Sequence, residues 1–158
     1  HSLSPAEVAL AVHRGMFDVA NSDEVFLTAF YGVLHRPTRR LTYIRAAHER
    51  PFLLRPGRDV MALPGGGRFL GMMPDLSLVE ETIELLPGDR LVMFSDGVPD
   101  AVNEADQGNS NQQLAAAITA CGPRPAAEIV RYLVKDVAQW QGNAAPFDDL
   151  TLLVLEAK

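Results

Sequence analysis

The most constraining feature of this sequence is residues 87–100, where a turn, an apolar strand and a carboxylate follow one another. Pro presets φ and Gly permits a positive φ, so Pro87 and Gly88 predict a turn. The apolar run at residues 91–94 predicts a short strand that is buried on both faces. Asp96 follows this strand directly. Its carboxylate either caps a turn or is a ligand held rigidly at a pocket edge, and this stretch alone leaves both interpretations open.

The composition is that of an ordinary globular domain, since 47% of the 158 residues are hydrophobic and 22% are charged. It predicts one domain over residues 1–158. The net charge of −6 argues against a nucleic-acid-binding protein, which would present a basic patch. The single cysteine, Cys121, is interpreted as a small apolar residue at a helix end and fits a reducing, cytoplasmic location. We find neither a signal peptide nor an apolar run of the roughly 20 residues that span a bilayer.

Local patterns predict helices and short strands in alternation. The first helix, residues 5–21, begins with a capping box formed by Ser4 and Glu7. Further helices are predicted at residues 112–120 and 125–141. Runs of apolar, β-branched and aromatic residues predict strands at residues 25–34, 40–46, 52–54, 60–63, 78–86, 90–95 and 150–155. Because the strands are short and separated by turn residues, they favour an antiparallel meander.

Three other groups have two interpretations each. His48 would bind a metal ion or a phosphate, or its ring would order the connection by a hydrogen bond to the backbone. The glycines at residues 65–67 would wrap a phosphate or form a flexible flap. Glu80, Glu81 and Glu84 would form a metal cluster or the solvent face of an edge strand, where charges block pairing. In each case we favour the second interpretation.

Two predicted strands carry carboxylates at their ends. Asp96 follows one strand, and Asp148 and Asp149 precede the last one. If these strands are antiparallel neighbours, the end of the first and the start of the second lie on the same sheet edge. Carboxylates that close repel each other unless they are protonated or bridged by a cation. Oxygen ligands select hard ions such as Mg²⁺ or Mn²⁺, and two such ions would clamp a phosphoryl group for attack by water.

Four motifs occur in the order found in a known family. Residues 88–98 (GDRLVMFSDGV) resemble its GD-L-[apolar]-TDG-[apolar] strand, and residues 148–154 (DDLTLLV) resemble its terminal DD-[apolar]-T strand. Residues 26–34 (FLTAFYGVL) resemble its F-T-x-F-Y-G-x-L strand, and residues 46–51 (AAHERP) resemble its AGHxP turn. The chain therefore resembles the SpoIIE/RsbU branch of the metal-dependent phosphatase 2C (PPM) superfamily.

The resemblance implies an α+β fold of stacked antiparallel β-sheets flanked by helices (α-β-β-α). It implies a protein serine/threonine phosphatase with two Mn²⁺ or Mg²⁺ ions and a metal-bound water as nucleophile. The substrate would be a phosphoprotein, such as a phosphorylated anti-sigma-factor antagonist in bacterial partner switching. Asp96 and Asp148 match metal ligands with a catalytic role, and Asp149 would be a further ligand or would orient them. Residues that would support the ligands without touching an ion are Gly97, Ser95 and His48.

The chain departs from the family pattern at Ser95 (family Thr), Ala47 (family Gly) and Asp100 (family Glu). Because Ala47 replaces a glycine, the sequence does not decide whether the backbone of this turn matches that of the family. The family's earlier segment, which carries the Asp that bridges both ions, does not occur in these residues. We therefore expect the N-terminal part of the domain, and a sensor domain, to precede residue 1. Alone, the chain would bind metal weakly and would form a homodimer through unpaired strand edges.

Two other functions stay open from the sequence. The chain would be a catalytically incomplete phosphatase-like domain that acts as a protein-binding or regulatory module. Alternatively, it would be an unrelated acidic α+β domain in which the Asp residues only cap turns. The ordered motifs argue against the last interpretation.

Overall fold

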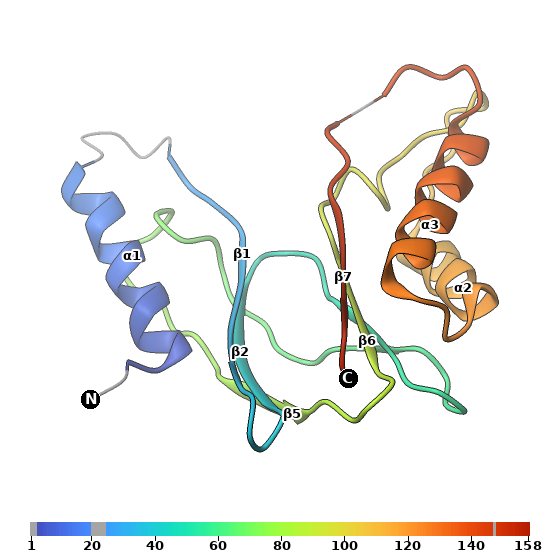
Figure 1. Cartoon of the computed structure of the whole chain (residues 1–158). Coiled ribbons are helices and arrows are strands. Elements are labelled where there is room, and N and C mark those ends of the chain that lie inside the picture. The colour runs from blue at the N-terminus through green and yellow to red at the C-terminus, as the bar shows by residue number, and fades with distance from the viewer. Residues whose placement is uncertain (1–2, 20–24, 147) are drawn as a thin grey trace. The chain divides into compact units, whose positions relative to one another are not determined.

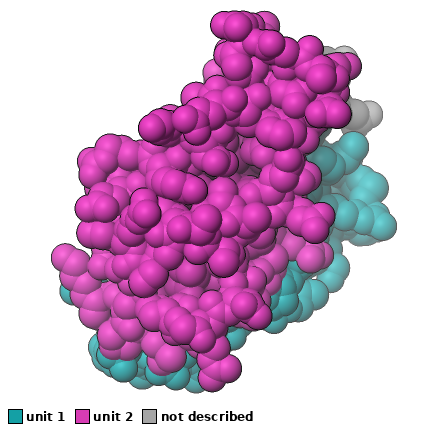
Figure 2. Space-filling view, turned by 90° about the vertical axis from the view of Figure 1, so that its right-hand side faces the viewer, with its two compact units in different colours: residues 1–48, 64–85 teal, residues 49–63, 86–158 magenta. Residues whose placement is uncertain are grey.

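Two antiparallel sheets and three helices make up the computed structural model, which describes residues 3–19, 25–146 and 148–158 (Figure 1). The predicted α+β class is therefore confirmed. Each sheet belongs to its own compact unit, and the two units are coloured separately in Figure 2. Unit 1 comprises residues 1–48 and 64–85, and unit 2 comprises residues 49–63 and 86–158. The stacking of one sheet on the other stays a prediction.

Unit 1 is a three-stranded sheet with one helix on it. The strand order is β1-β2-β5, and both neighbouring pairs are antiparallel. The helix α1 packs on β1 and β2, around the buried side chains of Ala9, Ile44, Ala46 and Leu70. The bounds of these elements are α1 Pro5–Val19, β1 Ala29–His35, β2 Arg40–Ala46 and β5 Glu81–Glu84.

The N-terminus of α1 is capped twice. The predicted capping box is confirmed, because the Ser4 amide donates to Glu7 Oε2 (2.7 Å) and the Glu7 amide donates to Ser4 Oγ (3.3 Å). Glu80 accepts a further hydrogen bond from the Ala6 amide (2.8 Å). Hydrogen bonds from the Ser4 side chain and the Ala6 backbone lower the pKa of Glu80. The strand β5 is an edge strand, as predicted. Glu80, the residue before β5, is bonded to the first turn of α1.

Unit 2 is a four-stranded antiparallel sheet covered by two helices. The strand order is β4-β3-β6-β7, which places β6 between β3 and β7. The helices α2 and α3 pack on each other, and Figure 1 shows them side by side. They enclose a core that includes Val92, Phe94, Ile118 and Ile129. The bounds are β3 Phe52–Leu54, β4 Met61–Ala62, β6 Arg90–Phe94, α2 Asn111–Cys121, α3 Ala126–Gln141 and β7 Leu152–Glu156.

The cysteine lies in this core, at the last residue of α2. Cys121 is buried, and desolvation raises the pKa of its thiol. A raised thiol pKa means little reactive thiolate, so the interpretation of Cys121 as a small apolar residue is confirmed.

Several predicted boundaries are wrong by a few residues. The strand predicted at residues 25–34 begins at Ala29, because residues 25–28 join their neighbour only through the bridge Leu27↔Leu70. The predicted helix 5–21 extends at least to Val19, and its last two residues lie outside the described part of the chain. The predicted single meander is also wrong. Its two hairpins, β1-β2 and β3-β4, belong to different sheets, which local turn signals cannot distinguish.

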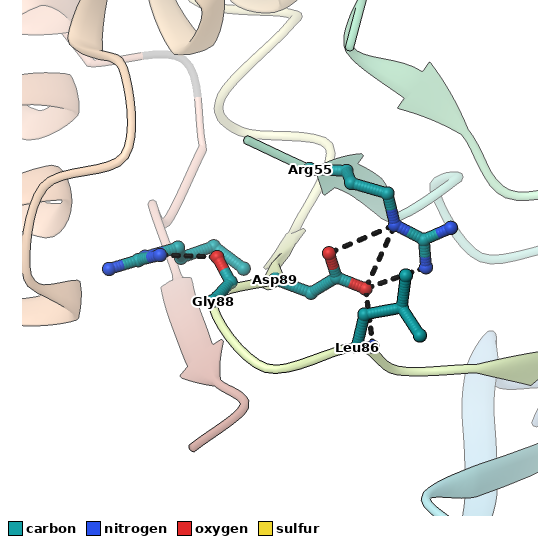
Figure 3. Close-up of polar contacts among 5 residues, drawn as sticks. Arg55, Leu86, Gly88 and Asp89 are labelled. Carbon is teal, nitrogen blue, oxygen red and sulfur yellow. Dashed lines mark hydrogen bonds and ion pairs between the residues drawn. The ribbon is translucent and has the colours of Figure 1, made fainter. Parts of the chain in front are cut away.

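A buried ion pair fixes the start of β6. The Asp89 amide donates to the Leu86 carbonyl (2.9 Å) and Gly88 has φ +89°, which confirms the predicted turn. The Asp89 side chain is 1% exposed and accepts from the Leu86 amide (2.8 Å) and from Arg55 Nε and Nη2 (3.0 and 2.7 Å). Figure 3 shows the Arg55 guanidinium and the Leu86 amide converging on this carboxylate. The opposite end of β6 leads directly to Asp96.

Candidate metal centre

The end of β6 and the start of β7 lie side by side, as the sequence predicts for antiparallel neighbours. The last register pair of the two strands is Phe94↔Leu152. One residue further, the Ser95 amide donates to the Thr151 carbonyl (3.0 Å) and Ser95 Oγ accepts from the Thr151 amide (2.9 Å). The same hydroxyl donates to the Asp149 carbonyl (3.1 Å). Ser95, the residue before Asp96, is therefore bonded to the backbone of the segment that carries Asp148 and Asp149.

Gly97 brings the two acidic segments into backbone contact. A Cβ at this position would lie 2.4 Å from the Asp149 carbonyl oxygen and 2.9 Å from the Asp149 carbonyl carbon. Both distances are shorter than side chains tolerate, and both partners are backbone atoms that cannot turn away. Glycine therefore permits this approach, and Asp96, Asp148 and Asp149 lie at one edge of the unit 2 sheet.

The three carboxylates are exposed, and two of them are oriented by backbone amides. Asp96 Oδ1 accepts from the Gly97 amide (3.1 Å), and Asp148 Oδ1 accepts from the Asp149 amide (2.7 Å). The Asp100 amide also donates to the Asp96 carbonyl (2.9 Å). The turn-capping interpretation of Asp96 is thus satisfied locally, and it leaves the carboxylate facing solvent at the sheet edge.

The donors at this edge are carboxylate oxygens, the type of ligand that hard ions prefer. Mg²⁺ is commonly held by one or two carboxylates, with water and substrate phosphate filling the other positions. Within the part of the chain that the structure describes, no group of three or more His, Cys, Asp or Glu side chains is gathered to hold an ion. The edge therefore offers part of a coordination sphere, and the roles predicted for Asp96, Asp148 and Asp149 stay predictions.

His48 orders its connection through a side chain, whereas we predicted a bond to the backbone. Its Nδ1 lies 3.1 Å from Thr28 Oγ1, and its carbonyl accepts from Arg45 Nη1 (2.7 Å). His48 belongs to unit 1, whereas the three aspartates belong to unit 2. Its support of the metal ligands stays a prediction.

The glycine run is attached to β2 and is not the flap that we predicted. Arg45 Nε donates to the Gly65 carbonyl (3.0 Å), and the Ala47 amide donates to the Gly67 carbonyl (3.1 Å). A Cβ on Gly67 would lie 2.5 Å from the Arg45 carbonyl oxygen. Next to the run, Tyr43 Oη donates to the Pro64 carbonyl (3.0 Å). Burial, helped by the nearby Glu81, raises the pKa of Tyr43 to about 12, which keeps this donor protonated.

Ala47 adopts the conformation that a glycine would adopt. Its φ is +51°, in the left-handed region that costs a residue with a Cβ about 1–2 kcal/mol. The turn backbone therefore keeps a glycine-like conformation despite the Gly-to-Ala difference from the family pattern. The contacts of Ala47 and Arg45 with the glycine run explain how the strained conformation is held.

Replacing Ala47 with glycine should stabilise the protein by about 0.5–1 kcal/mol, because relief of the positive φ exceeds the entropy that glycine adds to the unfolded chain. Urea denaturation followed by circular dichroism measures this change. The matched control is Ala46→Gly, one residue earlier in β2, which should destabilise because Ala46 is fully buried in regular strand. Equal destabilisation by both substitutions would contradict the conformational argument.

Comparison with known proteins identifies the family. The sequence matches the family described as Stage II sporulation protein E (SpoIIE) over residues 1–158. The chain belongs to the SpoIIE family. One curated relative of this SpoIIE chain is Protein IcfG of Synechocystis sp. (strain ATCC 27184 / PCC 6803 / Kazusa), which is 28% identical over 131 residues. That match covers 83% of the chain but only 20% of IcfG, so the chain spans one fifth of this relative.

Solved structures show the same fold. The SiaA-PP2C domain of Pseudomonas aeruginosa superposes with a TM-score of 0.88 at 21% identity, over 98% of this SpoIIE chain and 61% of that chain. The phosphatase domain of the cell fate determinant SpoIIE from Bacillus subtilis (Mn presoaked) gives a TM-score of 0.70 at 14% identity, over 100% and 77%. The architecture is thus that of PP2C-type phosphatase domains, as the sequence predicts.

Sequence reasoning missed residues that support the site from a distance. Asp89 and Arg55 are 34 positions apart, and their pairing fixes β6 from its other end. Glu104 and Asn143 are 39 positions apart and join the two acidic segments. No local pattern marks either pair, because both form only when the sheet and its connections are assembled. The polar loop at residues 103–110 was the one visible signal, and its composition alone does not name a partner.

Proposed function

We propose that residues 1–158 form a single, partial SpoIIE-type domain of a metal-dependent protein serine/threonine phosphatase. The observation that carries this proposal is the β6–β7 pairing, which brings Asp96 and the Asp148–Asp149 pair to one sheet edge in a SpoIIE-family chain. The ion would be Mn²⁺ or Mg²⁺, which matches the oxygen-only donor set. The manganese-soaked SpoIIE phosphatase domain of similar fold supports this choice.

Each residue has a defined task in this proposal. Asp96 and Asp148 are ligands presented by the strand ends, and Asp149 is a further ligand or orients them. Gly97 and Ser95 fix the distance between the two acidic segments through contacts with the Asp149 backbone. When bound, the ions supply Lewis acidity for a phosphoryl oxygen and for water. The protein chain keeps the Asp96 and Asp148 carboxylates oriented through the amides of Gly97 and Asp149.

The proposed substrate is a phosphoprotein that resembles a phosphorylated anti-sigma-factor antagonist, in bacterial signalling in the cytoplasm. Sensor or regulatory segments outside these residues fit the much greater length of IcfG. A homodimer is a further proposal, supported by the edge strand β1, which lacks charged residues over 29–34 and exposes Tyr31 and Val33. In the described residues, no helix has the length and apolarity needed to cross a membrane.

The test is metal-dependent hydrolysis of p-nitrophenyl phosphate and of a phosphoserine protein. We expect turnover by the full-length protein that depends on Mn²⁺ and disappears in Asp96→Asn, which removes one ligand charge while keeping the side-chain shape. Asp59→Asn, an exposed carboxylate in the β3–β4 connection, is the matched control and should retain activity. Turnover that is independent of Mn²⁺, or that survives Asp96→Asn unchanged, would refute the proposal.

A second function, a protein-binding module without catalysis, is favoured by one observation. The described residues gather no cluster of three metal-ligating side chains. In that case, calorimetry should detect no Mn²⁺ binding by the 158-residue chain or by the full-length protein. The phosphoprotein would then bind without being hydrolysed.

A further inference from the structure

Two connections of unit 2 carry the acidic residues. Residues 95–110 lead from β6 to α2 and include Asp96, and residues 142–151 lead from α3 to β7 and include Asp148 and Asp149. Figure 1 shows the second connection running from the end of α3 to the start of β7. Long connections without secondary structure are ordinarily the mobile part of a fold. Precise placement of the carboxylates therefore requires something that holds both connections.

One end of this pair of connections is held by Ser95. Its backbone and hydroxyl bind Thr151 and the Asp149 carbonyl at distances of 2.9–3.1 Å. These bonds fix the second connection where it enters β7. They do not reach residues 142–146, where the connection leaves α3.

The other end is held by Glu104. Its Oε1 accepts from both the Asn143 amide (2.9 Å) and Asn143 Nδ2 (2.8 Å). A Cβ on Gly142 would lie 3.0 Å from the same oxygen, so the carboxylate sits directly against the end of α3. Close by in sequence, Trp140 Nε1 donates to the Ala101 carbonyl (3.2 Å). The first connection is thus bonded to the last turn of α3, at Trp140, and to Asn143, the residue after the helix C-cap.

The loop that carries Glu104 is held by its own hydrogen bonds. Asn103 Oδ1 accepts from the amides of Ala105 and Gln107, both at 3.0 Å. The buried Asn109 closes the base of this loop, because its Nδ2 donates to the Val98 carbonyl (3.1 Å) and its amide donates to the Ala101 carbonyl (2.8 Å). A carboxylate on such a loop transmits its position to its partner, whereas one on a mobile loop would not.

We propose that Glu104 is a positioning residue that holds the segment carrying Asp148 and Asp149 in place relative to Asp96. With Asn143 fixed by Glu104, and with the Asp149 carbonyl and Thr151 fixed by Ser95, only the short segment between Asn143 and Asp149 lies between the two anchored points. Anchoring both ends reduces the conformations that this segment samples before an ion binds. The importance of that placement for metal binding rests on the function proposed above. The restraint of this segment by Glu104 does not depend on that proposed function.

The test compares Glu104→Ala, Glu104→Gln and Asp106→Asn in the full-length protein. Asp106 lies on the same exposed loop, and its substitution removes the same charge. Hydrogen exchange of the Ala144, Asp149 and Thr151 amides is measured without metal, and Mn²⁺ affinity is measured by calorimetry. Glu104→Ala should speed this exchange and weaken Mn²⁺ binding, each by roughly fivefold, as expected for loss of a charged hydrogen-bond acceptor at the surface.

Glu104→Gln keeps an acceptor oxygen and should have an intermediate effect, and Asp106→Asn should match the wild type. Unchanged exchange at these three amides in Glu104→Ala would overturn the proposal. So would a uniform rise in exchange over the whole sheet, since that indicates only global destabilisation. If the wild type binds no Mn²⁺, the proposed function fails. The exchange measurement still tests whether Glu104 holds the segment that carries Asp148 and Asp149.

Discussion

Gly97→Ala is expected to destabilise the protein by about 1–3 kcal/mol and to weaken Mn²⁺ binding, although alanine adds only one methyl group. The added Cβ would lie 2.4 Å from the Asp149 carbonyl oxygen. The clash can be relieved only by moving backbone, because Gly97 is buried and its opposing atoms belong to the main chain. Such a movement also breaks the hydrogen bond from Ser95 Oγ to the same carbonyl.

The measurement combines urea denaturation with calorimetric titration of Mn²⁺. The matched control is Gly108→Ala in the same connection, because a Cβ at Gly108 meets nothing within 4 Å. That substitution should change the free energy of unfolding by no more than about 0.5 kcal/mol. If Gly97→Ala were as mild as Gly108→Ala, the two acidic segments would not be in backbone contact, and the candidate metal centre would lose its main geometric support.

Asp89→Ala is expected to lower the free energy of unfolding by about 2–3 kcal/mol. Removing one partner of a buried ion pair typically costs 3–5 kcal/mol, and the 32% exposure of Arg55 reduces this cost because water reaches the remaining guanidinium. The Leu86 amide also loses its acceptor. For a chain of this length, the corresponding decrease in Tm is roughly 5–10 °C.

Three further variants separate the contributions at Asp89. Asp89→Asn keeps an acceptor for the Leu86 amide but removes the charge. Its free energy of unfolding should therefore lie between those of the wild type and the alanine variant. A double-mutant cycle with Arg55→Ala isolates the coupling of the ion pair. Thermal unfolding of the wild type, the three single variants and the double variant Asp89→Ala/Arg55→Ala provides the data. Additive effects of the two single substitutions would show that Arg55 and Asp89 do not stabilise each other.

The local features of the fold follow from short stretches of sequence. The capping box is predicted correctly because Ser4 and Glu7 lie three residues apart. The turn before β6 is predicted for the same reason. The bounds of β2 are also predicted correctly, from its own run of strand-forming residues. The resemblance implies more than one sheet, but the assignment of each strand to its sheet is not predicted, because strand pairing depends on long-range packing rather than on turn residues.

For the candidate site, too, some features follow from the sequence and others only from the tertiary structure. Order along the chain suggests that Asp96 and Asp148 meet, since a strand end and a strand start share an edge when neighbours are antiparallel. Whether those strands are neighbours depends on the whole sheet, and β6 and β7 do pair. The left-handed φ of Ala47 lies outside sequence reasoning, because it is imposed by contacts with the glycine run.

The sequence by itself determined the family, the order of the elements and the residue types at both strand ends, because these are properties of short motifs. The tertiary structure alone decided how the acidic segments are held. Gly97 against Asp149, Ser95 against Thr151 and Glu104 against Asn143 join residues that are distant along the chain. Such contacts depend on backbone separations of a few ångströms, which arise only when the sheet and both connections have packed.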